Sequence, residues 1–152
     1  MPSLLFLASV LALQSQQLTA TELSLGATAA MARRTFIGVE VGVGQRPSGD
    51  SRLALALAGG TIAARPAARA QLTLQLLVNP TARSGPGLYA GVGGAFTARH
   101  GSPGQGFLAV LLGVEGAPGR REGWYVELGL AGGVRAAAGW RMRWFPPWWG
   151  ER

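Results

Sequence analysis

The sequence predicts an all-β fold: a closed antiparallel up-and-down transmembrane β-barrel of about eight strands. Three observations predict it. Glycine supplies 24 of 152 residues and only 14% of residues are charged, whereas glycine disfavours helices and soluble domains average roughly 25% charged residues. From residue 21 onward, apolar side chains recur at every second position, which is the period of a β-strand. The alternating segments have about the length of 9–11 residues that a tilted strand needs to cross a bilayer.

Eight alternating segments follow one another along the chain, and turn signals rich in Gly, Pro or charged residues separate them. The predicted strands are 22–31, 36–44, 52–62, 70–78, 88–98, 106–115, 123–131 and 134–145. The predicted turns are 32–35, 45–51, 63–69, 79–87, 99–105, 116–122 and 132–133. An even number of strands is typical of single-chain transmembrane barrels.

The N-terminal segment differs from the rest of the chain. Residues 4–13 form a continuous apolar run that is too short for a membrane-spanning helix, which needs about 20 residues, but has the length of a signal-peptide core. We therefore expect a signal peptide over 1–20 with cleavage near Ala20, a barrel domain over 21–145 and a short tail over 146–152. The alternatives are a buried N-terminal segment and a start site that is assigned slightly wrongly.

The two faces of the predicted strands differ in composition. One face is rich in Leu, Val and Trp, and we expect it to contact lipid; its representative residues are Leu55, Leu74, Leu112, Leu128, Trp140 and Trp144. The other face consists mainly of small residues, which fit the narrow lumen of a small barrel. It also carries charges of both signs that can pair there, namely Glu22, Glu40, Glu115, Glu127, Arg135, Arg141 and Arg143.

Strand order predicts which lumen charges meet. The last two strands form a hairpin, so we expect Glu127 to lie beside Arg141 or Arg135. Closure of the barrel brings Glu22 toward Arg141 or Arg143. The alternative exchanges the two faces, which gives a soluble exported β-barrel that binds an apolar ligand.

The final predicted strand carries a family likeness. Gly139, Trp140, Met142, Trp144 and Phe145 resemble the aromatic-ending strand that the barrel-assembly machinery recognises. Together with the strand count, strand length and facing pattern over 21–145, they make the chain similar to the small eight-stranded outer-membrane barrels of the OmpA/OmpX type. The chain departs from that family by continuing beyond Phe145. The resemblance implies a Gram-negative outer-membrane location, a structural or interaction role and a monomeric state. An eight-stranded barrel is filled by its side chains, so we expect no open pore.

A catalytic alternative rests on a second resemblance. His100 and Ser102 are similar to the His-x-Ser arrangement of outer-membrane lipid A deacylases, which implies Ser102 as nucleophile, His100 as its base and Glu115 as the orienting carboxylate. Pro103 stands where that family has asparagine. The pair also lies in a Gly/Pro loop rather than on a rigid strand, so we expect no enzymatic activity.

The charge balance indicates partners. The formal net charge is +7, all 14 basic residues are arginine, and the chain has one histidine and no cysteine. We therefore expect no metal site and no cofactor. Outside the last strand, arginines concentrate in predicted turns at both rims: Arg33, Arg34, Arg46, Arg65, Arg69, Arg83, Arg99, Arg120 and Arg121. This distribution does not suit nucleic acid, which requires one basic face. It suits membrane lipid, including lipopolysaccharide phosphates.

Overall fold

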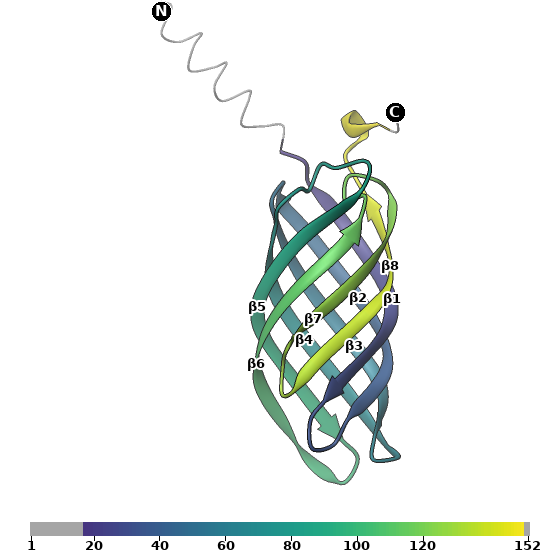
Figure 1. Cartoon of the computed structure of the whole chain (residues 1–152), viewed down its shortest axis with the longest axis vertical. Helices are drawn as coiled ribbons and strands as arrows, with labels where there is room; N and C mark the ends of the chain where they lie inside the picture. The colour runs from purple at the N-terminus through teal and green to yellow at the C-terminus, as the bar shows by residue number, and fades with distance from the viewer. Residues whose placement is uncertain (1–16, 151–152) are drawn as a thin grey trace, which may run out of the picture.

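The structure is a computed structural model that describes residues 17–150, and these residues form a closed antiparallel barrel of eight strands (Figure 1). The predicted fold class is confirmed. The strands are β1 (Ala20–Met31), β2 (Phe36–Ser48), β3 (Ser51–Ile62), β4 (Arg65–Leu77), β5 (Pro86–Arg99), β6 (Ser102–Gly116), β7 (Glu122–Leu130) and β8 (Val134–Trp144). A short 3₁₀ helix, η1 (Pro147–Trp149), follows β8. Most of the predicted signal peptide, residues 1–16, lies outside the described residues.

Each strand pairs with its sequence neighbours, and β1 pairs with β8 to close the barrel. We call one end of the barrel the terminus end: it holds Ala20, Trp144 and the turns 49–50, 78–85 and 117–121. We call the opposite end the turn end, which holds the turns 32–35, 63–64, 100–101 and 131–133. No helix within residues 17–150 is long and apolar enough to cross a membrane.

Several strands are longer than predicted, and three predicted turns are correspondingly too wide. The turn predicted at 63–69 is only Ala63 and Ala64, and those predicted at 45–51 and 99–105 are residues 49–50 and 100–101. Pro and Arg at the strand ends suggested turns, but the ladder continues through them, with a register irregularity between Gln45 and Ser48. Ala63 and Ala64 both have positive φ, at 50° and 60°, which is the backbone of a two-residue hairpin turn.

At the turn end, the strands of the barrel wall end at different levels along the barrel axis. The β5–β6 ladder continues down to the pair Arg99↔Ser102, whereas the β6–β7 ladder begins only at Val110↔Leu130. The β5–β6 hairpin therefore extends past the β7–β8 turn, as the lower part of Figure 1 shows. One edge of β6 over residues 102–109 is left without a ladder partner on the β7 side.

Candidate functional site

The barrel interior is ionic. Strand alternation turns four glutamates and six arginines of the described chain inward, and each is at most 5% exposed. They are Glu22, Glu40, Glu115, Glu127, Arg46, Arg52, Arg69, Arg135, Arg141 and Arg143. Burying charges is costly unless they are paired and hydrogen-bonded, so the partners of these groups determine what the interior can do.

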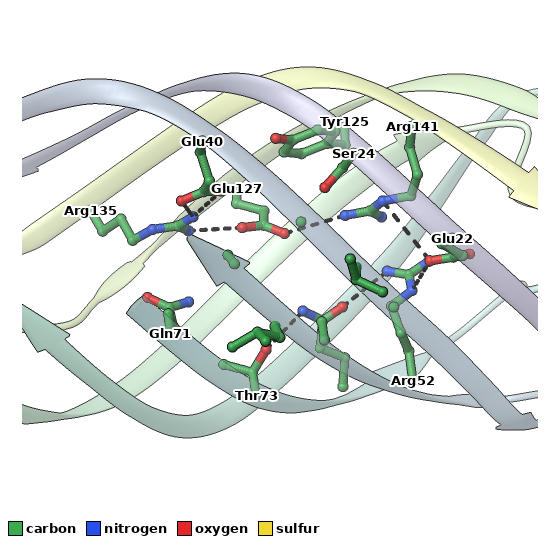
Figure 2. Close-up of a pocket in the computed structure, with 17 residues that line it drawn as sticks. Glu22, Ser24, Glu40, Arg52, Gln71, Thr73, Tyr125, Glu127, Arg135 and Arg141 are labelled. Atoms are coloured by element: carbon green, nitrogen blue, oxygen red, sulfur yellow. Dashed lines mark hydrogen bonds and ion pairs between the residues drawn. The ribbon is translucent and has the colours of Figure 1, made fainter. Parts of the chain in front are cut away.

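Glu127 and Glu40 share one arginine. Arg135 donates through Nη1 to Glu127 Oε2 at 2.8 Å and through Nη2 to Glu40 Oε1 at 2.7 Å. The Tyr89 hydroxyl donates to the other Glu127 oxygen at 2.7 Å, and Arg141 Nη2 lies 3.6 Å from that oxygen. Figure 2 shows Arg135 between the two carboxylates and Arg141 leading on toward Glu22. Both alternatives predicted for Glu127 are therefore within ion-pair distance, and Arg135 is the nearer.

A second cluster lies toward the terminus end around Glu115 and Glu22. Arg52 lies 2.6 Å from Glu115 Oε1 and Arg143 lies 2.8 Å from Glu115 Oε2, while Arg141 also donates to Oε2. Glu22 pairs with Arg46 at 2.7 Å and with Arg143 at 3.4 Å. Closure of β1 against β8 thus brings Glu22 beside the arginines of the last strand.

Turn carbonyls accept hydrogen bonds from three of the lumen arginines. Arg46 donates to the Pro80 and Pro118 carbonyls, each at 3.2 Å. Arg143 donates to the Arg120 carbonyl at 3.2 Å. At the turn end, Arg69 donates to the Ala131 carbonyl and, at 3.1 Å, to the Thr97 hydroxyl. These side chains join the strands to the turns that cover both ends of the lumen.

Little space remains between the clusters. The interior cavity, lined by both ion-pair groups, has a volume of about 30 Å³, which is room for about two water molecules. Within residues 17–150, the Tyr125 hydroxyl and the Gln71 side-chain oxygen are buried there without a hydrogen-bond partner. A chamber of this size holds water and excludes larger solutes.

Three lumen arginines were not assigned to the lumen by sequence reasoning. Arg46 and Arg69, predicted at the rims, are buried inside the barrel, at 1% and 5% exposure. Arg52 joins them at 1%. The physical reason is strand length: β2 and β4 continue through the predicted turns, so Arg46 keeps the inward side of Gly44 and Arg69 that of Gln71. Extending the alternation from Gly44 on to Arg46, and from Gln71 back to Arg69, would have found both.

The outer face is apolar. The six residues expected to contact lipid lie on it with exposures between 43% and 68%. They are Leu55, Leu74, Leu112, Leu128, Trp140 and Trp144. A soluble barrel that holds an apolar ligand requires the reverse arrangement, with apolar side chains lining an open interior. The ionic lumen and apolar exterior of the described barrel therefore argue against that alternative.

The deacylase-like residues do not assemble. Arg99 donates to the Ser102 hydroxyl at 2.6 Å, and His100 is exposed in the turn. Glu115 lies thirteen residues along β6 from Ser102, a separation on the order of 40 Å in an extended strand. Strand geometry thus puts the predicted orienting carboxylate near the opposite end of the barrel. No group of His, Cys, Asp and Glu within the described chain could hold a metal ion.

The C-terminal tail folds over the terminus end. The Trp149 indole donates to the Gly119 carbonyl at 2.8 Å. Arg83 donates to the Trp149 carbonyl at 2.7 Å, and its guanidinium lies 4.3 Å from the centre of the Trp149 ring. Phe145, Pro146 and Trp149 line a groove of about 750 Å³ beside the 117–121 turn.

Comparisons with known proteins concern the fold. No protein-family model and no curated protein sequence matches the chain. Among solved structures, the outer membrane protein OprG from Pseudomonas aeruginosa matches with a TM-score of 0.65 at 9% identity, covering 88% of this chain and 99% of that one. The N-terminal β-barrel domain of P. aeruginosa OprF matches with a TM-score of 0.64 at 14% identity, covering 82% and 97%.

A third solved structure carries a ligand. It is Ail, the attachment invasion locus protein of Yersinia pestis, in complex with the heparin analogue sucrose octasulfate. It matches with a TM-score of 0.50 at 8% identity, covering 84% of this chain and 99% of that one. At such low identities the likeness concerns the fold. With its eight strands, apolar exterior and ionic interior, the chain has the fold of these small eight-stranded outer-membrane barrels.

Proposed function

We propose that this chain is a non-catalytic barrel of the bacterial outer membrane with a sealed interior and a structural or interaction role. The observation that carries the proposal is the filled lumen. Two ion-pair clusters occupy the barrel between its ends, and the space between them measures about 30 Å³.

The energetics support a closed interior. Opening a path for ions requires separating Arg135 from Glu40 and Glu127, or Glu115 from its arginines. Removing one partner of a buried pair typically costs about 3–5 kcal/mol, because the remaining charge is left without compensation, so these pairs resist separation inside the barrel. The arginines that bind turn carbonyls at both ends add further contacts to be broken. These contacts therefore favour the sealed state over an open one.

Conductance across a planar lipid bilayer tests this proposal. The purified chain, refolded in detergent and added to the bilayer, is expected to give no discrete current steps, while a general porin in the same lipid gives them. Insertion is verified in parallel by the heat-dependent gel mobility of the protein recovered from liposomes. Reproducible current steps from inserted wild-type protein would overturn the sealed-barrel proposal.

Exposed cations support an interaction role. Arg33, Arg34 and Arg65 are exposed at the turn end, and Arg120 and Arg121 at the terminus end. Guanidinium groups bind phosphate and sulfate oxygens through two parallel hydrogen bonds. The Ail barrel was solved with a heavily sulfated saccharide, which makes polyanion binding a reasonable role for a barrel of this fold. Binding of sucrose octasulfate to this chain, measured by calorimetry in detergent, tests this proposed polyanion-binding role.

The final strand supports a biogenesis partner. β8 carries Trp140 and Trp144 on its outer face, and Phe145 follows it directly. We propose that the barrel-assembly machinery recognises this segment and that the assembled barrel is a monomer. Truncation after Arg143 is expected to reduce outer-membrane assembly in cells while the same chain still refolds in detergent.

A further inference from the structure

The surface of the terminus end is more elaborate than that of the turn end. The two longest turns of the described barrel, 78–85 and 117–121, both lie at the terminus end, and the C-terminal tail folds against them (Figure 1). At the turn end, no turn of the described chain is longer than the four residues 32–35. Because binding residues gather on loops that a rigid scaffold positions, a docking site is expected at the terminus end.

Backbone hydrogen bonds fix the two long turns to each other. The Ala117 N–H donates to the Gly85 carbonyl at 2.9 Å. The Gly119 N–H donates to the Ala82 carbonyl at 2.7 Å. A Cβ at Gly119 would lie 2.5 Å from the Thr81 carbonyl oxygen, so the glycine permits this close approach. The two turns therefore form one surface that is already ordered before a ligand binds, which lowers the entropy cost of binding.

The tail completes this surface. The Trp149 indole donates to the Gly119 carbonyl at 2.8 Å, and Arg83 donates to the Trp149 carbonyl at 2.7 Å. The Phe145 ring lies beside the Trp149 ring, with the ring centres 6.0 Å apart. Tail and turns enclose a groove of about 750 Å³, which falls within the roughly 300–1,000 Å³ of ligand pockets. We call it the tail groove.

The tail groove combines guanidinium groups with apolar surface. Among the described residues, three arginines line it against the single carboxylate of Glu122, so its charge favours an anionic ligand. The arginines are Arg83, Arg120 and Arg121. Two aromatic and two proline side chains supply the apolar lining: Phe145, Trp149, Pro146 and Pro147. Arginine beside aromatic residues is the composition of protein–protein interfaces, in which Trp and Arg contribute much of the binding free energy.

A partner protein fits this combination better than a free anion or a second copy of the chain. A free sulfate or phosphate would contact the arginines and leave the apolar lining uncovered. Two copies joined through the tail groove would bring the arginines of both copies together, and such like charges repel each other. A polypeptide segment with acidic residues next to apolar ones can contact both parts of the groove.

We propose that the tail groove binds an acidic segment of a partner protein, whose carboxylates pair with Arg120 and Arg121 and whose apolar side chains cover Phe145 and Pro146. The proposal rests on the interaction role proposed above and names the class of partner and the end of the barrel that binds it. Both arginines are exposed, and a guanidinium group holds a carboxylate through two parallel hydrogen bonds. Glu122 opposes an acidic ligand and limits its affinity.

Selection from a random peptide library displayed on phage tests the proposal. The target is the barrel refolded in detergent, and the counter-selection target is the double variant Arg120→Gln with Arg121→Gln. The matched control is Arg33→Gln with Arg34→Gln, which removes two adjacent exposed arginines from a turn of the opposite end. Heat-dependent gel mobility verifies the folding of each protein.

The enriched peptides are expected to carry acidic residues next to apolar ones. The affinity of the most enriched peptide, measured by fluorescence anisotropy, should fall about tenfold in the double variant and stay at the wild-type value in the control. Glu122→Gln removes the negative charge of the lining and should strengthen binding about twofold. The Glu122 variant tests the groove independently if the double variant does not fold.

Three results would each overturn the proposal: no enrichment of acidic peptides over the counter-selection, an equal loss of affinity in the control, or weaker binding by the Glu122 variant. Binding of sucrose octasulfate through Arg120 and Arg121 without peptide enrichment would also overturn it, because the groove would then be a site for polyanions. Current steps from the wild-type barrel, or its absence from outer membranes, would refute the proposed function while peptide binding by the refolded barrel remained.

Discussion

Tyr89 packs its ring directly over Gly113, its partner across the β5–β6 ladder. From this position its hydroxyl reaches Glu127 at 2.7 Å. The guanidinium groups of Arg52 and Arg141 lie 5.0 Å and 5.4 Å from the ring centre. Tyr89 therefore connects the two ion-pair clusters, and the missing side chain of Gly113 makes room for it.

Substituting Gly113 should displace the tyrosine. A Cβ at this position would overlap the Tyr89 ring, so Gly113→Ala is expected to lower the free energy of unfolding by about 1–3 kcal/mol, measured by urea titration in lipid vesicles. Gly94→Ala is the control, because its Cβ would meet only the Phe107 carbonyl oxygen at 3.8 Å. Equal stability of the two variants would contradict the packing described.

The lumen ion pairs should show energetic coupling. Glu127→Gln and Arg135→Met are each expected to destabilise the barrel by about 3–5 kcal/mol, because each leaves a buried charge without its partner. The double variant should recover part of the loss, with a coupling energy of about 0.5–3 kcal/mol. The cycle with Arg141→Met, whose guanidinium lies 3.6 Å from Glu127, should give the smaller coupling. Zero coupling in both cycles would falsify the paired-lumen arrangement.

An arginine on the lipid-facing surface should be costly at mid-strand. Leu74 is 52% exposed on the outer face of β4, opposite Leu53 and Val92 on the adjacent strands. Leu74→Arg is expected to cost about 2–4 kcal/mol at the bilayer midplane, whereas Ala68→Arg, on the same face near the turn end, should cost about 0–1 kcal/mol. Urea unfolding in vesicles measures both costs. Equal costs would show that the penalty for an arginine on this face does not depend on its depth in the membrane.

The tail contact should depend on Arg83. Arg83→Gln removes the guanidinium from the face of Trp149 and is expected to release the Trp149 indole from the Gly119 carbonyl. Faster hydrogen exchange of that indole proton in NMR spectra measures the release. Arg120→Gln is the control on the neighbouring turn. A protected indole in the Arg83 variant would show that the tail is held by other contacts.

Two substitutions in the Ala63–Ala64 turn should make the barrel more stable. Both alanines have left-handed backbone, which costs residues with a side chain roughly 1–2 kcal/mol each, and the Asn-Gly dipeptide suits such a turn best. Ala63→Asn with Ala64→Gly is expected to raise the free energy of unfolding by about 1–2 kcal/mol. The same urea assay measures it, and a loss of stability would argue against the assigned turn geometry.

Alternation, together with composition, was sufficient to predict the fold class and the facing of the strands. The period of two is a direct consequence of the extended backbone, and the apolar or polar character of each set of alternate residues assigned Leu74 and Glu127 to opposite faces without coordinates. Arg46 and Arg69 keep the same alternation, but they lie just outside the predicted strands, in segments where Pro47 and Pro66 indicate turns. The ladder register shows that the strands continue through these segments.

Contacts made by the turns and the tail could not be predicted from the sequence. The bonds from Arg46 to the Pro80 and Pro118 carbonyls join turns 34 and 72 residues away, and no local pattern encodes such a meeting. The catalytic alternative was weakened for a related reason. His100 and Ser102 lie close in sequence, but the third residue, Glu115, lies near the other end of the extended strand β6.

The unequal height of the barrel wall has a consequence for the surrounding bilayer. Backbone amides without partners are not tolerated in hydrocarbon, and the β6 edge before Val110 has none on the β7 side. The hydrocarbon boundary beside β7 and β8 must therefore lie no farther out than the Val110–Leu130 pair. Across the barrel, lipid can extend farther along β3 and β4. The bilayer around this protein is thus expected to be thinner on one flank, and the barrel axis to tilt relative to the membrane normal.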